Sequence, residues 1–189
     1  PNFPAACIHF LMDSIEFEYR ERCLDVGCAV GRSSFELAKY FEHVDAIDYS
    51  SGFIDAAKKI QQSGSIEYSI PTEGRLSTDC QMSLESLLSS NIASRVTFQT
   101  GDACNLPSEM HTYDLVFAGN LIDRLYQPQL FLNSMLQRRC VGGWLVITSP
   151  YTWLEDYTPR NYWLGGYIDD AGDPVDTFTG LSRALHPQF

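Results

Sequence analysis

The fold of this chain is decided by a short stretch near its N-terminus, CLDVGCAVG at residues 23–31. Its first part, residues 23–26, is a short apolar run typical of a buried β-strand, and Gly27 and Gly31 then predict a tight turn. Over residues 33–41 apolar side chains recur at helical spacing. The stretch therefore predicts a strand, a glycine turn and a helix in direct succession, the opening unit of an α/β sheet.

Further strand and helix signals continue this unit in both directions along the chain. Upstream, apolar side chains at helical spacing over residues 5–20 predict an amphipathic helix that lies against the sheet. Downstream, we expect strands at 44–48, 96–99, 113–118 and 144–148 and helices at 50–61 and 128–139. Apolar strands that alternate with helices predict one Rossmann-like domain over residues 1–189, a doubly wound and mostly parallel sheet with helices on both faces.

Two segments interrupt the regular pattern. Residues 62–95 are mostly polar and predict an insertion with one short strand near 66–70 and a helical stretch at 84–88. This insertion is either a lid over the active site or a surface excursion. Residues 150–189 are rich in proline and glycine and show no convincing strand, so we expect a substrate-side loop and a truncated tail.

Composition excludes several classes of partner. The chain has 13 Lys and Arg against 24 Asp and Glu, and its net charge of −11 disfavours binding to a nucleic-acid backbone. No apolar run approaches the roughly 18 residues of a membrane span, so we expect no membrane association. The cysteines form no CxxC pair and no zinc-binding spacing, which predicts no metal site and reduced thiols in a cytoplasmic protein.

The glycine turn and a later acid together predict a nucleotide-cofactor site. Glycine lets the backbone approach a ligand closely, and Asp48 ends the second predicted strand about 20 residues after Gly27, where a carboxylate can accept both hydroxyls of a ribose. The turn itself is degenerate, since Ala29 stands where dinucleotide-binding turns carry their middle glycine. Read alone, the turn is a weak signal, and a purely structural turn is the less favoured alternative.

Two further acids discriminate between cofactors. Asp25 stands just before the turn, where a carboxylate suits the cationic methionine part of S-adenosylmethionine and repels a pyrophosphate. Asp102 follows the third predicted strand and can accept from an adenine amino group, while Ala103 donates its backbone N–H. The alternative role for Asp102 is a turn cap. The three acids favour S-adenosylmethionine over a nicotinamide dinucleotide.

This ordered set resembles the class I S-adenosylmethionine-dependent methyltransferases over residues 24–149. The resemblance implies S-adenosyl-L-methionine as cofactor and S-adenosyl-L-homocysteine as product. With the reasoning above, it gives the cofactor-binding residues Asp25, Gly27, Cys28, Ala29, Gly31, Asp48, Tyr49, Asp102, Ala103 and Asn120. It also implies closing antiparallel strands, which we do not find before Phe189, so we expect a truncated chain.

A narrower resemblance is carried by GCAVGRSSFEL at 27–37, GDACNL at 101–106, NLIDRL at 120–125 and TSPYTWLE at 148–155. These motifs are similar to those of the mercaptohistidine N-methyltransferase domain of ovothiol biosynthesis. The resemblance implies methyl transfer to an imidazole nitrogen of a small amino acid. It also implies fusion to, or work with, an iron-dependent sulfoxide synthase domain, and a chain that begins at Pro1 fits an excised C-terminal domain.

Substrate contacts are expected at the carboxyl ends of the fourth and fifth strands, where doubly wound sheets bind ligands. The candidate residues are Asn120, Asp123, Arg124, Tyr151, Trp153, Arg160 and Trp163. Arg124 or Arg160 could pair with a carboxylate, and Asp123 with an ammonium. The aromatic side chains could stack on an imidazole.

A neutral imidazole nitrogen is itself a nucleophile, so we expect no nucleophilic residue. Asp123 and Tyr151 are therefore expected to act in catalysis only by positioning the substrate.

Several alternatives remain open at this point. The aromatic residues could instead form core or lid contacts, and Asp123 with Arg124 could be a solvated ion pair. The chain could methylate another small molecule. It could also be a non-catalytic module that binds the cofactor without turnover.

Overall fold

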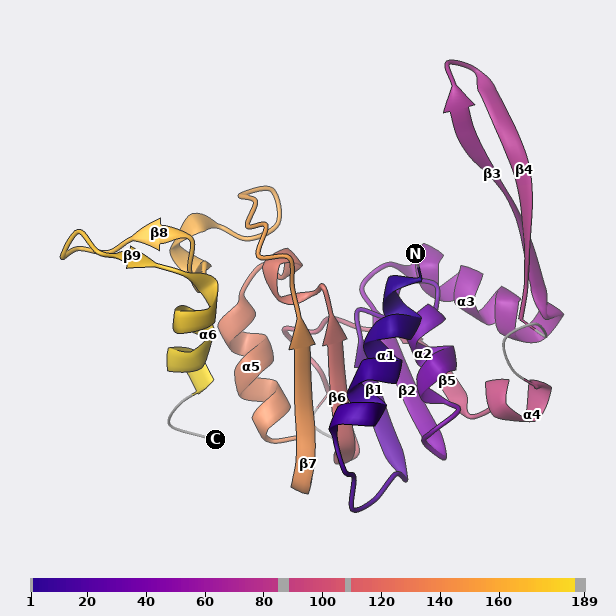
Figure 1. Ribbon diagram of the computed structural model, residues 1–189, viewed down its shortest axis with the longest axis horizontal. Coiled ribbons are helices and arrows are strands. Elements are labelled where there is room, and N and C mark those ends of the chain that lie inside the picture. Colours follow the sequence, from indigo (N-terminus) through magenta and orange to yellow (C-terminus); the bar gives the residue numbers. More distant parts are fainter. Residues whose placement is uncertain (1, 85–88, 108–109, 186–189) are drawn as a thin grey trace.

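The computed structural model describes residues 2–84, 89–107 and 110–185 of the chain. Five strands form one sheet, in which every neighbouring pair is parallel and the order is β5-β2-β1-β6-β7 (Figure 1). These strands are β1 (Arg22–Val26), β2 (His43–Asp48), β5 (Val96–Thr100), β6 (Tyr113–Gly119) and β7 (Arg139–Thr148). The helices are α1 (Phe3–Ser14), α2 (Arg32–Leu37), α3 (Ser51–Ser63), α4 (Ser90–Ala93), α5 (Pro128–Leu136) and α6 (Thr177–Leu185), with short 3-10 turns η1 (Ile122–Arg124) and η2 (Arg160–Tyr162).

Helices pack on both faces of the sheet and bury a core on each. Along β6, Leu115 and Phe117 join one apolar cluster, while Val116 and Ala118 join another, because successive side chains point to opposite faces. The first cluster contains buried residues of α1, α2 and α3, and the second contains those of α5. The predicted Rossmann-like, doubly wound sheet is thus confirmed.

The N-terminal helix is shorter than predicted. α1 ends at Ser14 rather than at residue 20, and Ile15 has an extended backbone. Phe17 still packs against the core, with its ring edge-on to Phe41 at 5.5 Å. Ile15 and Phe17 therefore face the core from a chain that has left the helix, where alternate residues share a face. Tyr19, which was assigned to the helix on its spacing, is exposed.

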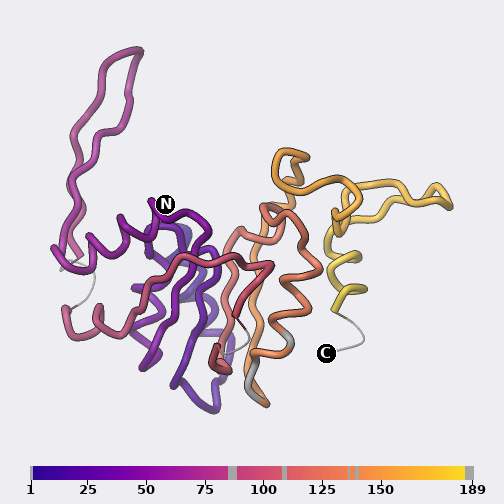
Figure 2. The backbone as a smooth tube through the Cα atoms, turned by 180° about the vertical axis from the view of Figure 1, so that it is seen from behind, coloured from indigo at the N-terminus to yellow at the C-terminus, as the bar shows by residue number. Residues whose placement is uncertain are grey.

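Residues 62–95 differ most from the prediction of one strand and a helix. They form the antiparallel hairpin of β3 (Ser65–Glu73) and β4 (Leu76–Ser83), followed by α4. Figures 1 and 2 show this hairpin rising away from the sheet, at the opposite end of the molecule from the C-terminal segment. The second strand escaped prediction because its sequence, LSTDCQMS, is mostly polar. Of the predicted helical stretch, residues 85–88 lie outside the described residues.

The prediction of no strand after residue 149 is wrong. The short strands β8 (Tyr167–Ile168) and β9 (Pro174–Val175) pair antiparallel and lead into α6. Among the described residues, no antiparallel strand joins the five-stranded sheet. Over the same residues, no helix is both long and apolar enough to cross a membrane.

Close backbone contact fixes α6 against the loop before β8. A Cβ atom on Gly180, in the second turn of α6, would overlap the carbonyl oxygen of Leu164. A Cβ atom on Gly165 would likewise overlap the backbone at Asp176 and Thr177. Because backbone atoms cannot rotate away as a side chain can, these two glycines set how closely the loop and the helix approach.

We expect Gly180→Ala to destabilise the protein by about 1–3 kcal/mol, the usual cost of overpacking. The free energy of unfolding in urea, followed by tryptophan fluorescence, measures this effect. Gly52→Ala is the matched control, because its Cβ would have room in α3 and alanine favours a helix by roughly 0.5–1 kcal/mol. Equal stability of the two variants would contradict the close contact.

Candidate functional site

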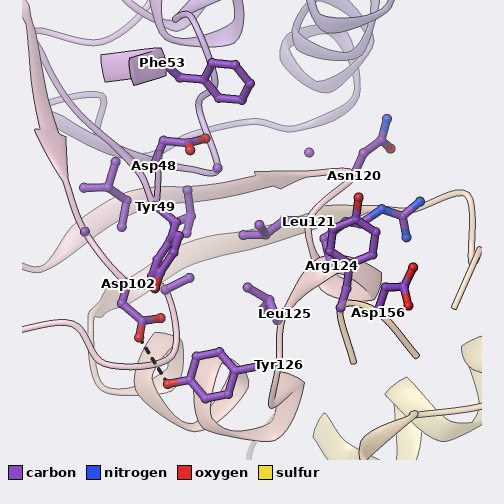
Figure 3. A pocket seen from close by; sticks show the side chains of 17 residues that line it. Asp48, Tyr49, Phe53, Asp102, Asn120, Leu121, Arg124, Leu125, Tyr126 and Asp156 are labelled. Carbon is purple, nitrogen blue, oxygen red and sulfur yellow. Dashed lines mark hydrogen bonds between the residues drawn. The ribbon is translucent and has the colours of Figure 1, made fainter. Parts of the chain in front are cut away.

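A pocket of about 590 Å³ opens at the carboxyl edge of the sheet (Figure 3). Loops after β1, β2, β5 and β6 supply most of its wall, and the loop after β7 supplies the rest. Its lining residues are Val26, Gly27, Ile47, Asp48, Tyr49, Phe53, Gly101, Asp102, Ala103, Gly119, Asn120, Leu121, Arg124, Leu125, Tyr126, Asp156 and Tyr157. This is the edge at which parallel α/β sheets bind ligands, and the volume is typical of small-molecule sites.

The glycine turn after β1 forms the floor of this pocket. Gly27 and Gly31 have φ angles of 76° and 88°, which favour glycine. The backbone N–H groups of Gly27 and Cys28 donate to the carbonyl of Ile47 at 2.8 and 3.0 Å. A Cβ atom on Gly31 would lie 2.6 Å from the Phe98 ring, so this turn has no room for a larger residue.

Asp48 joins the turn to the start of α3. Its Oδ2 accepts from the backbone N–H of Ala29 at 2.9 Å, and its Oδ1 accepts from the backbone N–H of Ser50 at 2.9 Å. Each carboxylate oxygen can accept more than one hydrogen bond. Asp48 is therefore held rigidly at the pocket wall with acceptor capacity left for a ligand hydroxyl.

Asp102 is held in a similar way on a neighbouring loop. Its Oδ1 accepts from the backbone N–H of Cys104 at 2.8 Å, and its Oδ2 accepts from the hydroxyl of Tyr126 at 3.1 Å (dashed line in Figure 3). Partial desolvation and the hydrogen bond to Asp102 raise the pKa of Tyr126 to about 12, so its hydroxyl stays a donor at neutral pH.

Asp25 does not line the pocket, although it was predicted to bind the cofactor. Its side chain is 1% exposed, and its Oδ2 accepts from the hydroxyls of Ser33 at 2.7 Å and Ser34 at 2.6 Å, both in α2. Burial raises the pKa of Asp25 to about 6, although the serine hydrogen bonds lower it, and the charge of Asp48 raises it further. Asp25 therefore fastens α2 to β1 behind the glycine turn.

Six of the ten predicted cofactor residues line the pocket, namely Gly27, Asp48, Tyr49, Asp102, Ala103 and Asn120. Ala29 and Gly31 lie in the same turn but contribute only backbone geometry, since Ala29 donates to Asp48 and Gly31 caps α2. Cys28 is buried, and desolvation raises the pKa of its thiol well above the usual range. The structure thus separates residues that face the pocket from residues that support it.

Asp123 is completely buried and does not face the pocket. Its Oδ1 accepts from the Ser149 hydroxyl at 2.8 Å. Its Oδ2 accepts from Nη1 of Arg124 at 2.8 Å and from both the backbone N–H and the hydroxyl of Thr152 at 3.0 Å. The alternative of a solvated ion pair with Arg124 does not hold for Asp123, which is buried, although the Arg124 side chain is 32% exposed. Asp123 joins the loops after β6 and β7.

Arg124 and Asn120 are the predicted substrate residues that line the pocket. Asn120 has a φ angle of 54°, and its backbone N–H donates to the carbonyl of Thr148 at 2.8 Å. The guanidinium of Arg124 lies over the ring of Tyr157 at 5.2 Å. Two loops far apart in sequence thus meet at one wall.

The other predicted substrate residues lie outside the pocket lining. Trp153 is buried, donates to the Thr177 hydroxyl at 2.8 Å, and stacks on Trp163 with 6.2 Å between ring centroids. Arg160 lies over the ring of Trp163. Tyr151 is 45% exposed, with a φ angle of 56°. The core-contact alternative for these aromatics therefore applies to Trp153, whose indole packs the C-terminal segment onto α6.

Sequence reasoning missed four polar or aromatic residues of the pocket, Phe53, Tyr126, Asp156 and Tyr157. Phe53 lies in the first turn of α3, directly after the capping Ser50, and Tyr126 follows η1. Asp156 and Tyr157 lie in the loop that was expected on the substrate side. Their positions were thus inferable, but their side-chain direction was not. Within the described part of the chain, no cluster of three or more His, Cys, Asp or Glu residues could hold a metal ion.

Fold and pocket together define a Rossmann-like protein that binds a nucleotide-type cofactor at the carboxyl edge of its sheet. A family model described as a methyltransferase domain matches residues 24–147, more than half of the chain. The chain therefore belongs to this methyltransferase family, the class I S-adenosylmethionine-dependent methyltransferases.

Individual relatives share parts of this chain. Norajmaline N-methyltransferase of Rauvolfia serpentina is 26% identical over 127 residues, which is 67% of this chain and 35% of that protein. The chain thus spans about a third of that relative's length.

Solved structures share the fold. The [4+2]-cyclase SpnF has a TM-score of 0.64 at 16% identity, over 97% of this chain and 57% of that one. The glycopeptide N-methyltransferase MtfA, solved with S-adenosylmethionine, has a TM-score of 0.55 at 15% identity, over 78% of this chain and 56% of that one.

The pocket fits S-adenosylmethionine, the cofactor of the family. Two carboxylates, Asp48 and Asp102, are pinned by backbone N–H groups and keep free acceptor capacity. Apolar side chains of Ile47, Leu121 and Leu125 provide a wall for a purine ring. The pocket thus offers both the hydrogen-bond acceptors and the apolar surface that an adenosine needs.

We expect Asp48→Ala to weaken S-adenosylmethionine binding by about 1–3 kcal/mol, because it removes charge-assisted hydrogen bonds. Calorimetric titration of the protein with the cofactor measures the loss. Asp55→Ala, an exposed acid on α3 outside the pocket, should bind as the unmodified protein does. Unchanged affinity after Asp48→Ala would contradict the ribose-binding role.

The raised pKa of Asp25 predicts a pH-dependent stability. The folded protein holds the carboxyl proton up to about pH 6, whereas the unfolded chain releases it near 3.8. Relative to Asp25→Asn, which cannot titrate, the unmodified protein should lose about 3 kcal/mol of unfolding free energy as pH rises from about 4 to 7. Urea unfolding of both proteins over this range tests it, and a pH-independent difference would refute the shift.

Proposed function

We propose that this chain transfers a methyl group from S-adenosylmethionine to an imidazole nitrogen of mercaptohistidine, the N-methylation step of ovothiol biosynthesis. The observation that carries the proposal is a set of hydrogen bonds between two loops. These loops hold two of the motifs that resemble the mercaptohistidine N-methyltransferase domain, NLIDRL at 120–125 and TSPYTWLE at 148–155. Asp123 of NLIDRL binds Ser149 and Thr152 of TSPYTWLE, and Arg124 binds Thr152 as well. The first motif lines the pocket through Asn120 and Arg124, and the second, which lies outside the lining, holds the first in place.

The relatives give limited support for a nitrogen acceptor. Norajmaline N-methyltransferase and the glycopeptide N-methyltransferase MtfA both carry this reaction class in their names. The acceptors of these two relatives differ from mercaptohistidine. The relatives therefore support methylation of a nitrogen atom on a small or accessible acceptor.

Each end of the pocket has a distinct role in this proposal. Asp48 binds the ribose hydroxyls, and Asp102 with the backbone of Ala103 binds the adenine edge. The backbone of Gly27 and the side chain of Asn120 face the methionine part. When bound, the cofactor supplies an electrophilic methyl group on a sulfonium. Asp25, Ala29 and Gly31 hold the turn in shape from behind.

The protein's own contribution to the reaction is alignment. A neutral imidazole nitrogen carries its own lone pair, so the chain needs to hold that nitrogen in line with the methyl group and exclude water. The lone pair would form the new N–C bond as the bond between the methyl carbon and the sulfonium breaks, with its electron pair left on the sulfur of S-adenosylhomocysteine. The ring would then lose its N–H proton to solvent. Asp123 positions the acceptor wall through Arg124. Tyr151, on the loop after β7, lies outside the pocket lining and makes no contact with the acceptor in this proposal.

The remaining parts of the proposal follow from the same resemblance. An iron-dependent sulfoxide synthase, fused or separate, would supply the sulfur-bearing histidine. A free thiol on the acceptor suits a reducing compartment, which agrees with a cytoplasmic location.

Incubation of the chain with S-adenosylmethionine and a mixture of histidine and mercaptohistidine, followed by mass spectrometry, tests the function. We expect singly methylated mercaptohistidine and unmodified histidine, and a strongly reduced yield with Asp48→Ala. Methylation of histidine alone would overturn the acceptor. Cofactor binding without any methylated product would instead favour another acceptor or a module that binds without turnover.

A further inference from the structure

Two side chains of opposite charge line the same part of the pocket. Figure 3 shows Arg124 and Asp156 close together in the view, on the side away from Asp48 and Asp102. The chain brings them together in a defined way, since Tyr157, next to Asp156, places its ring 5.2 Å from the Arg124 guanidinium. This part of the pocket, defined by Asn120, Arg124, Asp156 and Tyr157, is the acceptor end.

The hydrogen bonds of Arg124 leave one edge of its guanidinium free. Nη1 donates to the carbonyl and Oδ2 of Asp123 and to the carbonyl of Thr152, all within 2.8 Å. Nη2 donates once, to the Thr152 hydroxyl at 2.7 Å. Among the described residues, no acceptor meets Nε or the second N–H of Nη2. These two donors lie on one edge of the planar group, the edge that binds a carboxylate through two parallel hydrogen bonds.

Asp156 is a solvent-exposed acid at the same end. Its carboxylate forms no hydrogen bond or ion pair with any other residue that the structure describes. The preceding acid, Glu155, instead approaches Arg160 at 3.9 Å and does not line the pocket. Asp156 is therefore the acid of this loop that is available to a ligand in the pocket.

The balance of charges at the acceptor end then limits which chemical class of ligand can bind there. The positive charge of Arg124 is offset by the buried carboxylate of Asp123 at 2.8 Å, so the acceptor end as a whole carries the charge of Asp156. A plain carboxylic acid would meet this net negative charge unfavourably. A plain amine would leave the free edge of Arg124 without a partner. A ligand with both groups satisfies both.

We infer that the acceptor end recognises a free α-amino acid as a zwitterion, with the carboxylate on Nε and Nη2 of Arg124 and the ammonium on Asp156. This inference rests on the proposed function and assigns the side chains that bind the two charged groups of its substrate. It moves ammonium recognition from Asp123, expected from the sequence, to Asp156. Asp123 becomes a positioning residue, because it holds the other edge of the guanidinium.

The consequence is selectivity against three kinds of near-substrate. A peptide-bound residue lacks both charges, a decarboxylated amine lacks one, and a deaminated acid lacks the other. Each loss leaves Arg124 or Asp156 unpaired beside a ligand. Hydrogen bonds to charged groups contribute about 1.5–3 kcal/mol, which corresponds to roughly 10- to 100-fold in affinity.

The test is ligand binding to the protein saturated with S-adenosylhomocysteine, measured by calorimetry. The ligands are mercaptohistidine, its decarboxylated amine and its deaminated acid. We expect mercaptohistidine to bind about 10- to 100-fold more tightly than either. Asp156→Asn should remove the preference for mercaptohistidine over the deaminated acid. It should weaken binding of mercaptohistidine, and it should bind the deaminated acid at least as tightly because the opposing negative charge is gone. Glu155→Gln, with the same charge change one residue away, should keep the full preference.

The outcomes separate this inference from the proposed function. Two results would overturn the zwitterion site and leave the proposed function in place. In the first, mercaptohistidine is methylated but binds no more tightly than its deaminated acid. In the second, mercaptohistidine binds more tightly than the acid, but this preference survives Asp156→Asn. If mercaptohistidine is neither bound nor methylated, a mixture of free proteinogenic amino acids is screened by saturation-transfer NMR. Binding that requires Asp156 then supports the site and rejects the proposed acceptor. Absence of any amino-acid binding overturns both.

Discussion

The pocket depends on how the carboxylate of Asp48 is held at the end of β2. Its two oxygens accept from the backbone N–H groups of Ala29 and Ser50, so one side chain fixes both the glycine turn and the start of α3. The parallel register makes this possible, because Val26 of β1 lies opposite Ile47 of β2 and brings the two strand ends together. A carboxylate that accepts two backbone N–H groups is already oriented before a ligand arrives. The cofactor half of the site is therefore preorganised by local backbone geometry.

The acceptor half depends on a second carboxylate of a different kind. Asp123 is completely buried, and its charge is tolerated because Arg124, Ser149 and Thr152 all donate to it. Removing one partner from such a buried pair leaves an uncompensated charge, which is strongly destabilising. The loops after β6 and β7 are thus joined through a contact between residues about 25–30 positions apart in the chain. Shape in this half comes from tertiary contacts rather than from a local motif.

That difference explains which parts of the molecule could be predicted from sequence. The strand, glycine turn and helix at 23–41, and the acids after β2 and β5, are short-range patterns with fixed backbone consequences. The direction of Asp25 follows from alternation along β1, where Cys23 faces the α1–α3 core, and the sequence argument overlooked this. Strand β4 gave no signal because a hairpin exposed on both sides has no apolar face to reveal. Asp156 gave no signal either, because the direction of a side chain in a loop depends on how the loop folds and cannot be inferred from the sequence.

Since a fold does not determine its chemistry, the proposed function assigns the specificity for the acceptor to the acceptor end. The structural similarity to a [4+2]-cyclase covers 97% of this chain, so the sheet and the cofactor-side loops alone do not determine the reaction. The segment after β7 contributes Asp156 and Tyr157 to the pocket. Trp153, Trp163 and the two close glycines, Gly165 and Gly180, fix this segment on α6. A substitution at residue 156 can therefore change the charge offered to an acceptor while the cofactor half, built on different strands and different hydrogen bonds, keeps its geometry.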